Sequence, residues 1–223
     1  PKDWDVCCQK WIGLFQQPTH LRLDDQPLLI FFSPGELQQA FGGVEGVRKA
    51  LGSLRDKAKD AGLPGVAIAA CTGPGGHLDD LARSGYTLLT GYNYNLGWQS
   101  GGGSQPFQKL IEGNRRIFDQ FAEQTPLPYV PVVTVGWDRR PWEQGKLPPE
   151  KMSVWYPDRT PNLVEEFVRV GVRWLDEHPD KGTAQRLLLL YAWNENGEGG
   201  YLTPTAADGT EYLEAVERAI STK

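Results

Sequence analysis

Five apolar runs alternate with stretches of helical periodicity along the chain. The runs cover residues 27–32, 66–71, 87–92, 129–135 and 187–193. Their length suits short β-strands, and the continuous run Leu187–Leu190 is typical of a strand buried on both faces of a parallel sheet. Because helical patterns separate the runs, the alternation predicts an α/β fold with a parallel sheet.

Helical spacing and helix-boundary residues predict six helices, which begin near Asp3, Val44, His77, Pro106, Pro161 and Tyr212. The first of them, Asp3–Phe15, has no strand before it. Asp208 and Glu211 have the spacing of a capping box for the last helix. The glycine- and serine-rich segment 97–104 is predicted to be a surface loop that carries Trp98.

The segment that follows the last strand, residues 193–201, concentrates the candidate chemistry. Glu195 and Glu198 are two carboxylates three residues apart, beside the amide of Asn194 and the rings of Trp193 and Tyr201. Burial disfavours each charge, and each carboxylate disfavours ionisation of the other. Catalysis uses such a pair when one carboxyl must stay protonated as an acid while the other stays ionised as a base. A polar turn with a salt-bridged Glu198 is the alternative interpretation.

The spacing of the two carboxylates constrains the backbone between them. Residues three apart in a regular strand point to opposite faces. Both side chains reach one cleft only if the backbone leaves strand geometry, and Gly197 is the residue expected to permit this. Glu198 is expected in the more enclosed environment, as suits a general acid that works near neutral pH.

Residues 191–204, YAWNENGEGGYLTP, resemble the W-N-E-W-x-E-G-x-x-L-E-P signature of the glycoside hydrolase family 99-like proteins. That group includes endo-α-mannosidases and the WbsX-type polysaccharide-locus proteins often labelled glycosyltransferases. Residues 21–32 and 136–142 resemble two further stretches of the family. Asn196 stands where the family usually has Trp, and Thr203 where it often has Glu. Both departures bear on the identity of the substrate.

The resemblance implies a glycoside hydrolase (EC 3.2.1.-) that acts on a polysaccharide or glycan. Glu195 and Glu198 match the family's catalytic carboxylates, with Glu198 as general acid and Glu195 as the base that deprotonates the sugar's own 2-hydroxyl. The expected substrate-binding residues are Asn194, Asp138 and Tyr92, which position hydroxyl groups, and Trp137, Trp193 and Tyr201, which stack on sugar rings. A salt bridge of Asp138 with Arg139 or Arg140 is the alternative. No metal or organic cofactor is required by this chemistry.

Two other functions remain open at this point. One is a non-catalytic carbohydrate-binding or scaffold domain. The other is a WbsX-type glycosyltransferase in polysaccharide biosynthesis. The D-x-D sequence at Asp3-Trp4-Asp5 lies on the first predicted helix and away from the strand ends, so a metal site for a nucleotide sugar has little support.

The family's fold is expected to be a (β/α)8 TIM barrel, which needs about 250 residues and eight strands. Since the 223 residues supply five predicted strands, residues 1–223 are expected to be a single catalytic domain made of the barrel's five C-terminal βα units. The first three units would then lie upstream of Pro1. Two open sheet edges would favour self-association or completion by other polypeptide. An open five-stranded parallel sheet is the structural alternative.

Composition argues against several classes of partner and site. The formal net charge of −5 and the lack of a basic block argue against a nucleic-acid partner. No apolar run approaches the roughly 20 residues of a membrane span. The odd count of three cysteines implies no disulfide framework, and all three are expected to be buried as small apolar residues. The three histidines are scattered and make no metal-ligand spacing.

Overall fold

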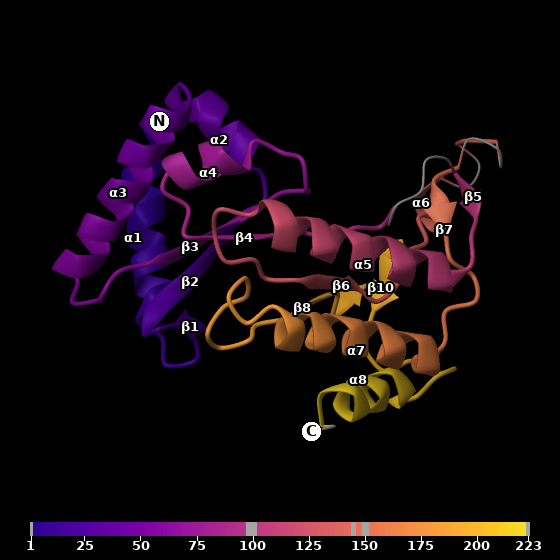
Figure 1. The fold of residues 1–223 in the computed structure, drawn as a ribbon. Helices are drawn as coiled ribbons and strands as arrows, with labels where there is room; N and C mark the ends of the chain where they lie inside the picture. Colours follow the sequence, from indigo (N-terminus) through magenta and orange to yellow (C-terminus); the bar gives the residue numbers. More distant parts are fainter. Residues whose placement is uncertain (1, 97–101, 144–145, 149–151, 222–223) are drawn as a thin grey trace. The chain divides into compact units, whose positions relative to one another are not determined.

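The computed structural model describes residues 2–96, 102–143, 146–148 and 152–221, and Trp98 lies outside them (Figure 1). The chain divides into two compact units. The first consists of residues 1–91, 124–130 and 179–187. The second consists of residues 92–123, 131–178 and 188–223.

The sheet of the first unit has the strand order β1-β2-β3-β4, with bounds Arg22–Leu23, Gln26–Phe31, Ala67–Cys71 and Leu88–Thr90. Strands β2, β3 and β4 are parallel neighbours, with Leu28 opposite Ala67 and Ala69 opposite Leu88. Tyr129 adds a parallel bridge to Leu89. These pairs confirm the predicted parallel order. The antiparallel β1–β2 hairpin was not predicted.

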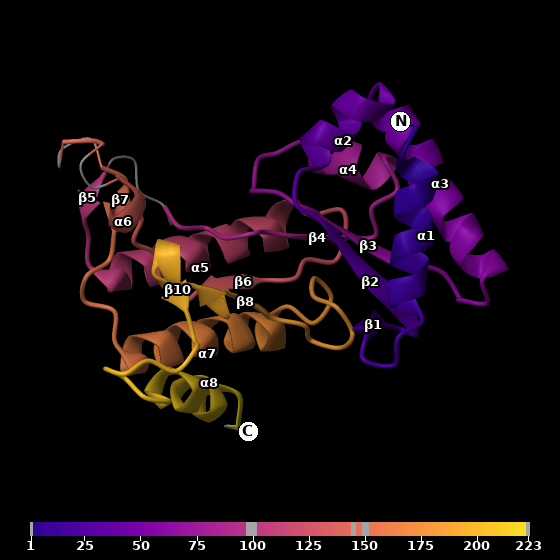
Figure 2. The same ribbon diagram turned by 180° about the vertical axis from the view of Figure 1, so that it is seen from behind.

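Four helices belong to the first unit: α1 (Trp4–Phe15), α2 (Pro34–Phe41), α3 (Val44–Asp60) and α4 (Leu78–Arg83). Helix α1 lies against β2 (Figure 2), where Trp4 and Trp11 pack their rings on Phe31. Helix α2 is not among the six predicted helices, because a proline just after the apolar run 27–32 is typical of the end of a strand. Pro34 instead opens the helix, since a proline at the first position loses no helical hydrogen bond.

The second unit contains α5 (Phe107–Gln124), α6 (Arg140–Glu143), α7 (Pro161–Glu177) and α8 (Glu211–Ser221), with strands β5 (Gly103–Ser104), β6 (Val132–Thr134), β7 (Val154–Trp155), β8 (Leu189–Tyr191), β9 (Asn194–Glu195) and β10 (Gly200–Tyr201). The 3-10 helix η2 (Asn196–Glu198) separates β9 from β10. Strand β6 pairs with β8 in parallel, as predicted, with Val132 opposite Leu189. The short β5–β7 and β9–β10 pairs were not predicted.

Strand β8 is less buried than its sequence predicts. It begins at Leu189 rather than at Leu187, and all four leucines of the run are only half-buried. The prediction of burial on both faces is therefore wrong. The physical reason is that, among the described residues, β8 pairs with β6 alone, so one of its edges has no neighbouring strand.

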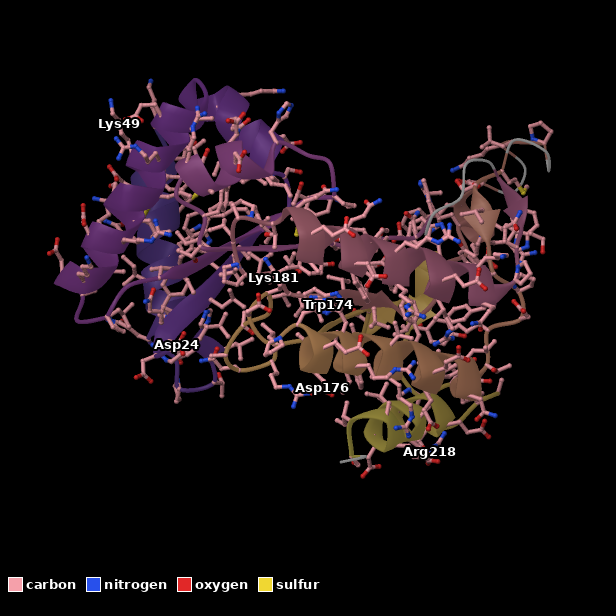
Figure 3. The ribbon with its side chains drawn as sticks, viewed as in Figure 1. Asp24, Lys49, Trp174, Asp176, Lys181 and Arg218 are labelled. Carbon is pink, nitrogen blue, oxygen red and sulfur yellow. The ribbon has the colours of Figure 1, made fainter. Side chains whose placement is uncertain are left out.

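Helices α7 and α8 pack side by side in both ribbon views (Figures 1 and 2). Arg218 of α8 and Arg169 of α7 both donate to the carboxylate of Glu165, and Figure 3 labels Arg218 together with Trp174 of α7. Thr160 caps α7 by accepting a hydrogen bond from the backbone N–H of Leu163, as its place before a proline predicts.

The predicted capping box of the last helix is wrong. Helix α8 begins at Glu211, and the residue before it is Thr210, whose hydroxyl donates to the carboxylate of Glu214 at 2.7 Å. The carboxylate of Asp208 instead accepts from the hydroxyl of Thr205. Asp208 therefore stabilises the turn that precedes the helix.

The three cysteines are free, but only Cys8 is buried, whereas Cys7 and Cys71 are half-buried. Burial raises the pKa of the Cys71 thiol to about 11, which keeps it protonated and unreactive at neutral pH. Among the described residues, no helix is both long and apolar enough to cross a membrane.

Two glycine-to-alanine substitutions test the packing of α7 on the β6–β8 pair. A Cβ at Gly171 would lie 2.7 Å from Leu188 and 3.2 Å from Val133, whereas one at Gly52 of α3 meets nothing within 4 Å. Gly52→Ala should stabilise the protein by about 0.5–1 kcal/mol through helix propensity. Gly171→Ala should destabilise it by about 1 kcal/mol because the core is overpacked. Urea unfolding checks both values, and equal stabilisation by the two substitutions would contradict this packing.

Candidate active site

The backbone after β8 leaves strand geometry at the two candidate carboxylates. Glu195 closes the short strand β9 opposite Gly200 of β10, and Glu198 ends the 3-10 helix between them. The two glutamates therefore lie on one tight turn, as the spacing argument required. The residue in the left-handed region is Gly199, with a φ of 67°, and not the predicted Gly197.

The loop that follows β6 holds this turn in place. The backbone N–H of Asp138 donates to the carbonyl oxygen of Glu198 at 2.6 Å. A Cβ on Gly199 would lie 2.9 Å from that same backbone nitrogen. A Cβ on Gly197 would lie 2.7 Å from the indole nitrogen of Trp142, so this glycine permits close contact with a ring rather than an unusual φ. The turn and the loop are thus packed backbone against backbone.

Glu198 is bound by a tyrosine at the end of β8. Tyr191 is buried, and its hydroxyl donates a hydrogen bond to Oε2 of Glu198. Burial raises the pKa of Tyr191 far above its ordinary value of 10, and the adjacent Glu198 carboxylate raises it further. Tyr191 therefore stays protonated and remains a donor to Glu198 across the physiological pH range.

Glu195 also accepts a hydrogen bond from a tyrosine, Tyr92. The hydroxyl of Tyr92 lies 3.4 Å from Oε1 of Glu195, and the Tyr92 ring packs edge-on against that of Tyr191 with centroids 4.9 Å apart. Burial raises the pKa of Tyr92, and the charges of both Glu195 and Glu198 raise it further. Both carboxylates thus lie beside one tyrosine pair.

The Tyr92 loop is fixed by the second unit's own core. Oγ1 of Thr134, at the end of β6, accepts from the backbone N–H of Tyr94 at 3.0 Å. The amide of Asn114, on α5, donates to the carbonyl oxygen of Tyr94 at 3.1 Å. Tyr92 itself remains 44% exposed, so its hydroxyl is accessible from solvent.

Three of the predicted binding residues lie on the surface of the same turn. Trp193 is 56% exposed and Asn194 is exposed, whereas Tyr201 is half-buried. The guanidinium carbon of Arg159 lies 4.7 Å from the centre of the Tyr201 ring. One face of Tyr201 is therefore covered, while Trp193 offers a free surface for stacking.

Two predicted binding residues have structural roles instead. Trp137 is 5% exposed, with its ring beside that of Tyr191 and the guanidinium of Arg139, so it offers no open face to a sugar. Both carboxylate oxygens of Asp138 accept from Arg140, at distances of 2.6–3.1 Å. The alternative salt bridge of Asp138 is therefore present, and it is made with Arg140, whose backbone N–H also donates to Oδ1 of Asp138 at 3.0 Å.

Three residues of the candidate site, Tyr191, Trp142 and Arg159, were not predicted from the sequence. Tyr191 reads as the end of an apolar run, and Trp142 as part of a loop. Arg159 donates to the carbonyl oxygens of Val135 and Tyr201, at 2.6 and 2.5 Å, and thereby joins the ends of β6 and β10. Burial lowers the pKa of Arg159. No local pattern marks such a residue, because both of its acceptors are backbone atoms far away in sequence.

No group of three or more histidine, cysteine, aspartate or glutamate side chains is placed to hold a metal ion within the described parts of the chain.

The family model described as Glycosyltransferase WbsX matches residues 1–216. The chain belongs to the WbsX family. A curated relative, "Uncharacterized protein WxcX" of Xanthomonas campestris pv. campestris (strain B100), is 25% identical over 216 residues. This match covers 92% of the chain and 28% of the relative, so the chain spans well under half of the relative's length.

Solved structures similar to this WbsX-family chain include a glycoside hydrolase-like protein and a GH99 endo-α-mannosidase. A "glycoside hydrolase-like protein" matches with a TM-score of 0.66 at 12% identity, over 100% of this chain and 63% of its own. The GH99 endo-α-mannosidase from Bacteroides thetaiotaomicron matches with a TM-score of 0.58 at 14% identity, over 96% of this chain and 59% of its own. A second structure of that enzyme, with Bis-Tris propane, has a TM-score of 0.62 at 12% identity, over 97% and 62% of the two chains. These similarities show a fold of the (β/α)8-barrel type with parallel strands.

A spectroscopic titration tests the environment of Tyr191. Its burial against the Glu198 carboxylate predicts that this phenol ionises well above the ordinary value of 10. The difference in absorbance at about 295 nm between wild type and Tyr191→Phe should therefore stay flat through pH 10 while circular dichroism shows both proteins folded. The same pair unfolded in guanidinium should show the missing tyrosine titrating near pH 10. A transition near pH 10 in the folded pair would contradict the buried contact.

Proposed function

We propose that this protein is a glycoside hydrolase that acts on a polysaccharide or glycan through Glu195 and Glu198. The observation that carries the proposal is the arrangement of the two carboxylates on one turn, each bound by a tyrosine hydroxyl, with the two tyrosine rings in contact. Paired carboxylates that flank one bond are the machinery of most glycosidases.

In this proposal Glu198 is the general acid and Glu195 the base. Glu198 gives its proton to the departing glycosidic oxygen as the bond from that oxygen to the anomeric carbon breaks. Glu195 takes the proton of the sugar's own 2-hydroxyl, whose oxygen then bonds to the anomeric carbon. Water then attacks the anomeric carbon and opens this intermediate. Glu198 takes a proton from that water and Glu195 returns its proton to the 2-oxygen, so both carboxyls regain their starting states. The hydrogen bonds from Tyr191 and Tyr92 orient the two carboxylates.

The substrate would bind over the exposed surface of the same turn. Trp193 offers an open aromatic face, and an indole against a sugar ring buries apolar area while leaving the hydroxyl groups free. The amide of Asn194 and the hydroxyl of Tyr92 would position sugar hydroxyls, with the half-buried Tyr201 contributing its exposed edge. This chemistry requires no metal or organic cofactor.

Transfer from a nucleotide sugar is the second candidate, because the matching family model is described as a glycosyltransferase. The two activities differ in their requirement for a donor. A hydrolase releases sugars from an oligosaccharide in water alone, whereas a transferase needs an activated sugar. A binding module shows affinity for glycans without turnover.

We further infer that residues 1–223 form the C-terminal portion of a single barrel domain, with β2, β3, β4, β6 and β8 as the strands of five βα units. The 59–63% coverage of the structural neighbours supports this inference. Completion of the barrel by other polypeptide, or self-association, would then cover the free edge of β8.

Substituting either carboxylate by its amide tests the proposed activity. Glu195→Gln and Glu198→Gln should each lower turnover of a cleaved glycan at least about a hundredfold, the usual minimum loss when general acid–base catalysis is removed. Release of reducing ends from a panel of glycans, without any nucleotide sugar, measures the effect. Both variants should keep the wild-type circular dichroism spectrum and unfolding midpoint.

Glu177→Gln is the matched control, because Glu177 is an exposed carboxylate on α7. It should keep full activity. Turnover that survives both Glu195→Gln and Glu198→Gln would refute the catalytic roles. Product formation that depends on a nucleotide sugar would favour the transferase, and glycan binding without turnover would favour a binding domain.

A further inference from the structure

The turn that carries the carboxylates is bordered by Arg139, whose ion pair with Glu143 is too long to be a hydrogen bond. Arg139 follows Asp138 in the loop after β6, and its guanidinium carbon lies 5.9 Å from the ring centre of Trp137 and 5.6 Å from that of Trp142. Two indole faces thus hold the guanidinium by cation–π attraction. Such contacts position the group without neutralising its charge.

The ion pair of Arg139 is longer than that of its neighbour Arg140. Arg140 makes a bidentate pair with Asp138 at 2.6–3.1 Å. The Nε of Arg139, by contrast, lies 3.9 Å from a carboxylate oxygen of Glu143, beyond hydrogen-bond distance. Glu143 accepts instead from the backbone N–H and the hydroxyl of Ser153, at 2.8 and 2.5 Å. Within the described residues, the buried Nε of Arg139 has no hydrogen-bond acceptor.

Arg139 is partly exposed and is linked to the turn of the candidate carboxylates through Trp142. The Arg139 side chain is 40% exposed, so its outer nitrogens are open to solvent. Trp142, which covers one side of the guanidinium, is 46% exposed and contacts Gly197, the residue before Glu198 on the turn. The backbone N–H of Trp142 also donates to the carbonyl oxygen of Arg139 at 2.9 Å. Arg139 and Trp142 are therefore held together beside the turn.

We infer that Arg139 and Trp142 form a subsite for an acidic sugar, in which Trp142 stacks on the ring and Arg139 binds an oxyanion carried by it. A uronic acid carboxylate and a sulfate ester share this chemistry, since both accept hydrogen bonds from a planar guanidinium. The subsite compensates for the two glutamates, which would otherwise repel a negatively charged glycan. The inference rests on the proposed function, because it assigns the substrate class of the same site.

Binding of monosaccharides tests the subsite without any turnover. We would titrate protein containing ¹⁵N-labelled tryptophan with sodium glucuronate, glucose 6-sulfate and glucose at constant ionic strength, and follow the indole N–H of Trp142, assigned through Trp142→Phe. At least one of the two anions should bind about threefold to tenfold more tightly than glucose. This is the gain expected for one charge-assisted hydrogen bond at a partly exposed site. Binding of only one anion would identify the source of the oxyanion.

Arg139→Gln should abolish the preference for the anions and leave the weak binding of glucose unchanged. Arg116→Gln, an exposed arginine on α5, is the matched control and should keep the preference. Equal affinity for glucose and both anions in the wild type, or a preference that persists in Arg139→Gln, would overturn the subsite.

The two proposals fail separately. Because monosaccharides contain no bond to cleave, their binding does not depend on the catalytic roles of Glu195 and Glu198. Loss of hydrolysis with retained anion preference would refute the proposed function alone. Hydrolysis of neutral glycans, combined with equal binding of glucose and the anions, would refute the subsite alone.

Discussion

The hydrogen bond from Tyr191 to Glu198 is the interaction on which the candidate site depends. It joins a buried side chain at the end of β8 to the carboxylate of the half-buried Glu198, seven residues later. A carboxylate on a free turn would sample many rotamers, and fixing it costs side-chain entropy. The buried phenol limits that freedom, and its raised pKa keeps it a donor. The backbone bond from Asp138 to Glu198 fixes the turn itself.

Around this bond, tyrosine hydroxyls and an arginine position the side chains and loops of the site without forming ion pairs with the two glutamates. Tyr92 and Tyr191 bring neutral hydroxyls, rather than positive charges, to the two glutamates, so neither carboxylate is locked in a salt bridge with them. Arg159 binds carbonyl oxygens and the faces of Tyr201 and Tyr212. Both glutamates are thus held by neutral tyrosine hydroxyls, while Arg159 joins the second unit's loops through bonds to backbone carbonyl oxygens.

Local sequence patterns predicted the regular elements well where one physical signal dominated. Helical spacing and helix-boundary residues placed the first residues of α3 and α7 correctly, and apolar runs placed β3 within one residue of its bounds. The same signals did not predict burial correctly where it depends on which other elements pack against a strand. The leucines before Tyr191 look like a buried strand, yet their exposure is decided by which strands pair with β8. Helix α2 was missed because a proline can end a strand or begin a helix.

The sequence by itself determined the α/β character, the carboxylate pair Glu195 and Glu198, and the need for a break in the strand between them, because residue spacing and strand geometry are local. Only the tertiary structure decided which aromatic rings are accessible, which arginine neutralises Asp138, and which tyrosine binds each glutamate. Those outcomes depend on contacts between residues far apart in the chain, such as Tyr92 with Glu195, and a linear pattern carries no record of them. Burial, which separates Trp193 from Trp137, is likewise a property of packing and not of residue type.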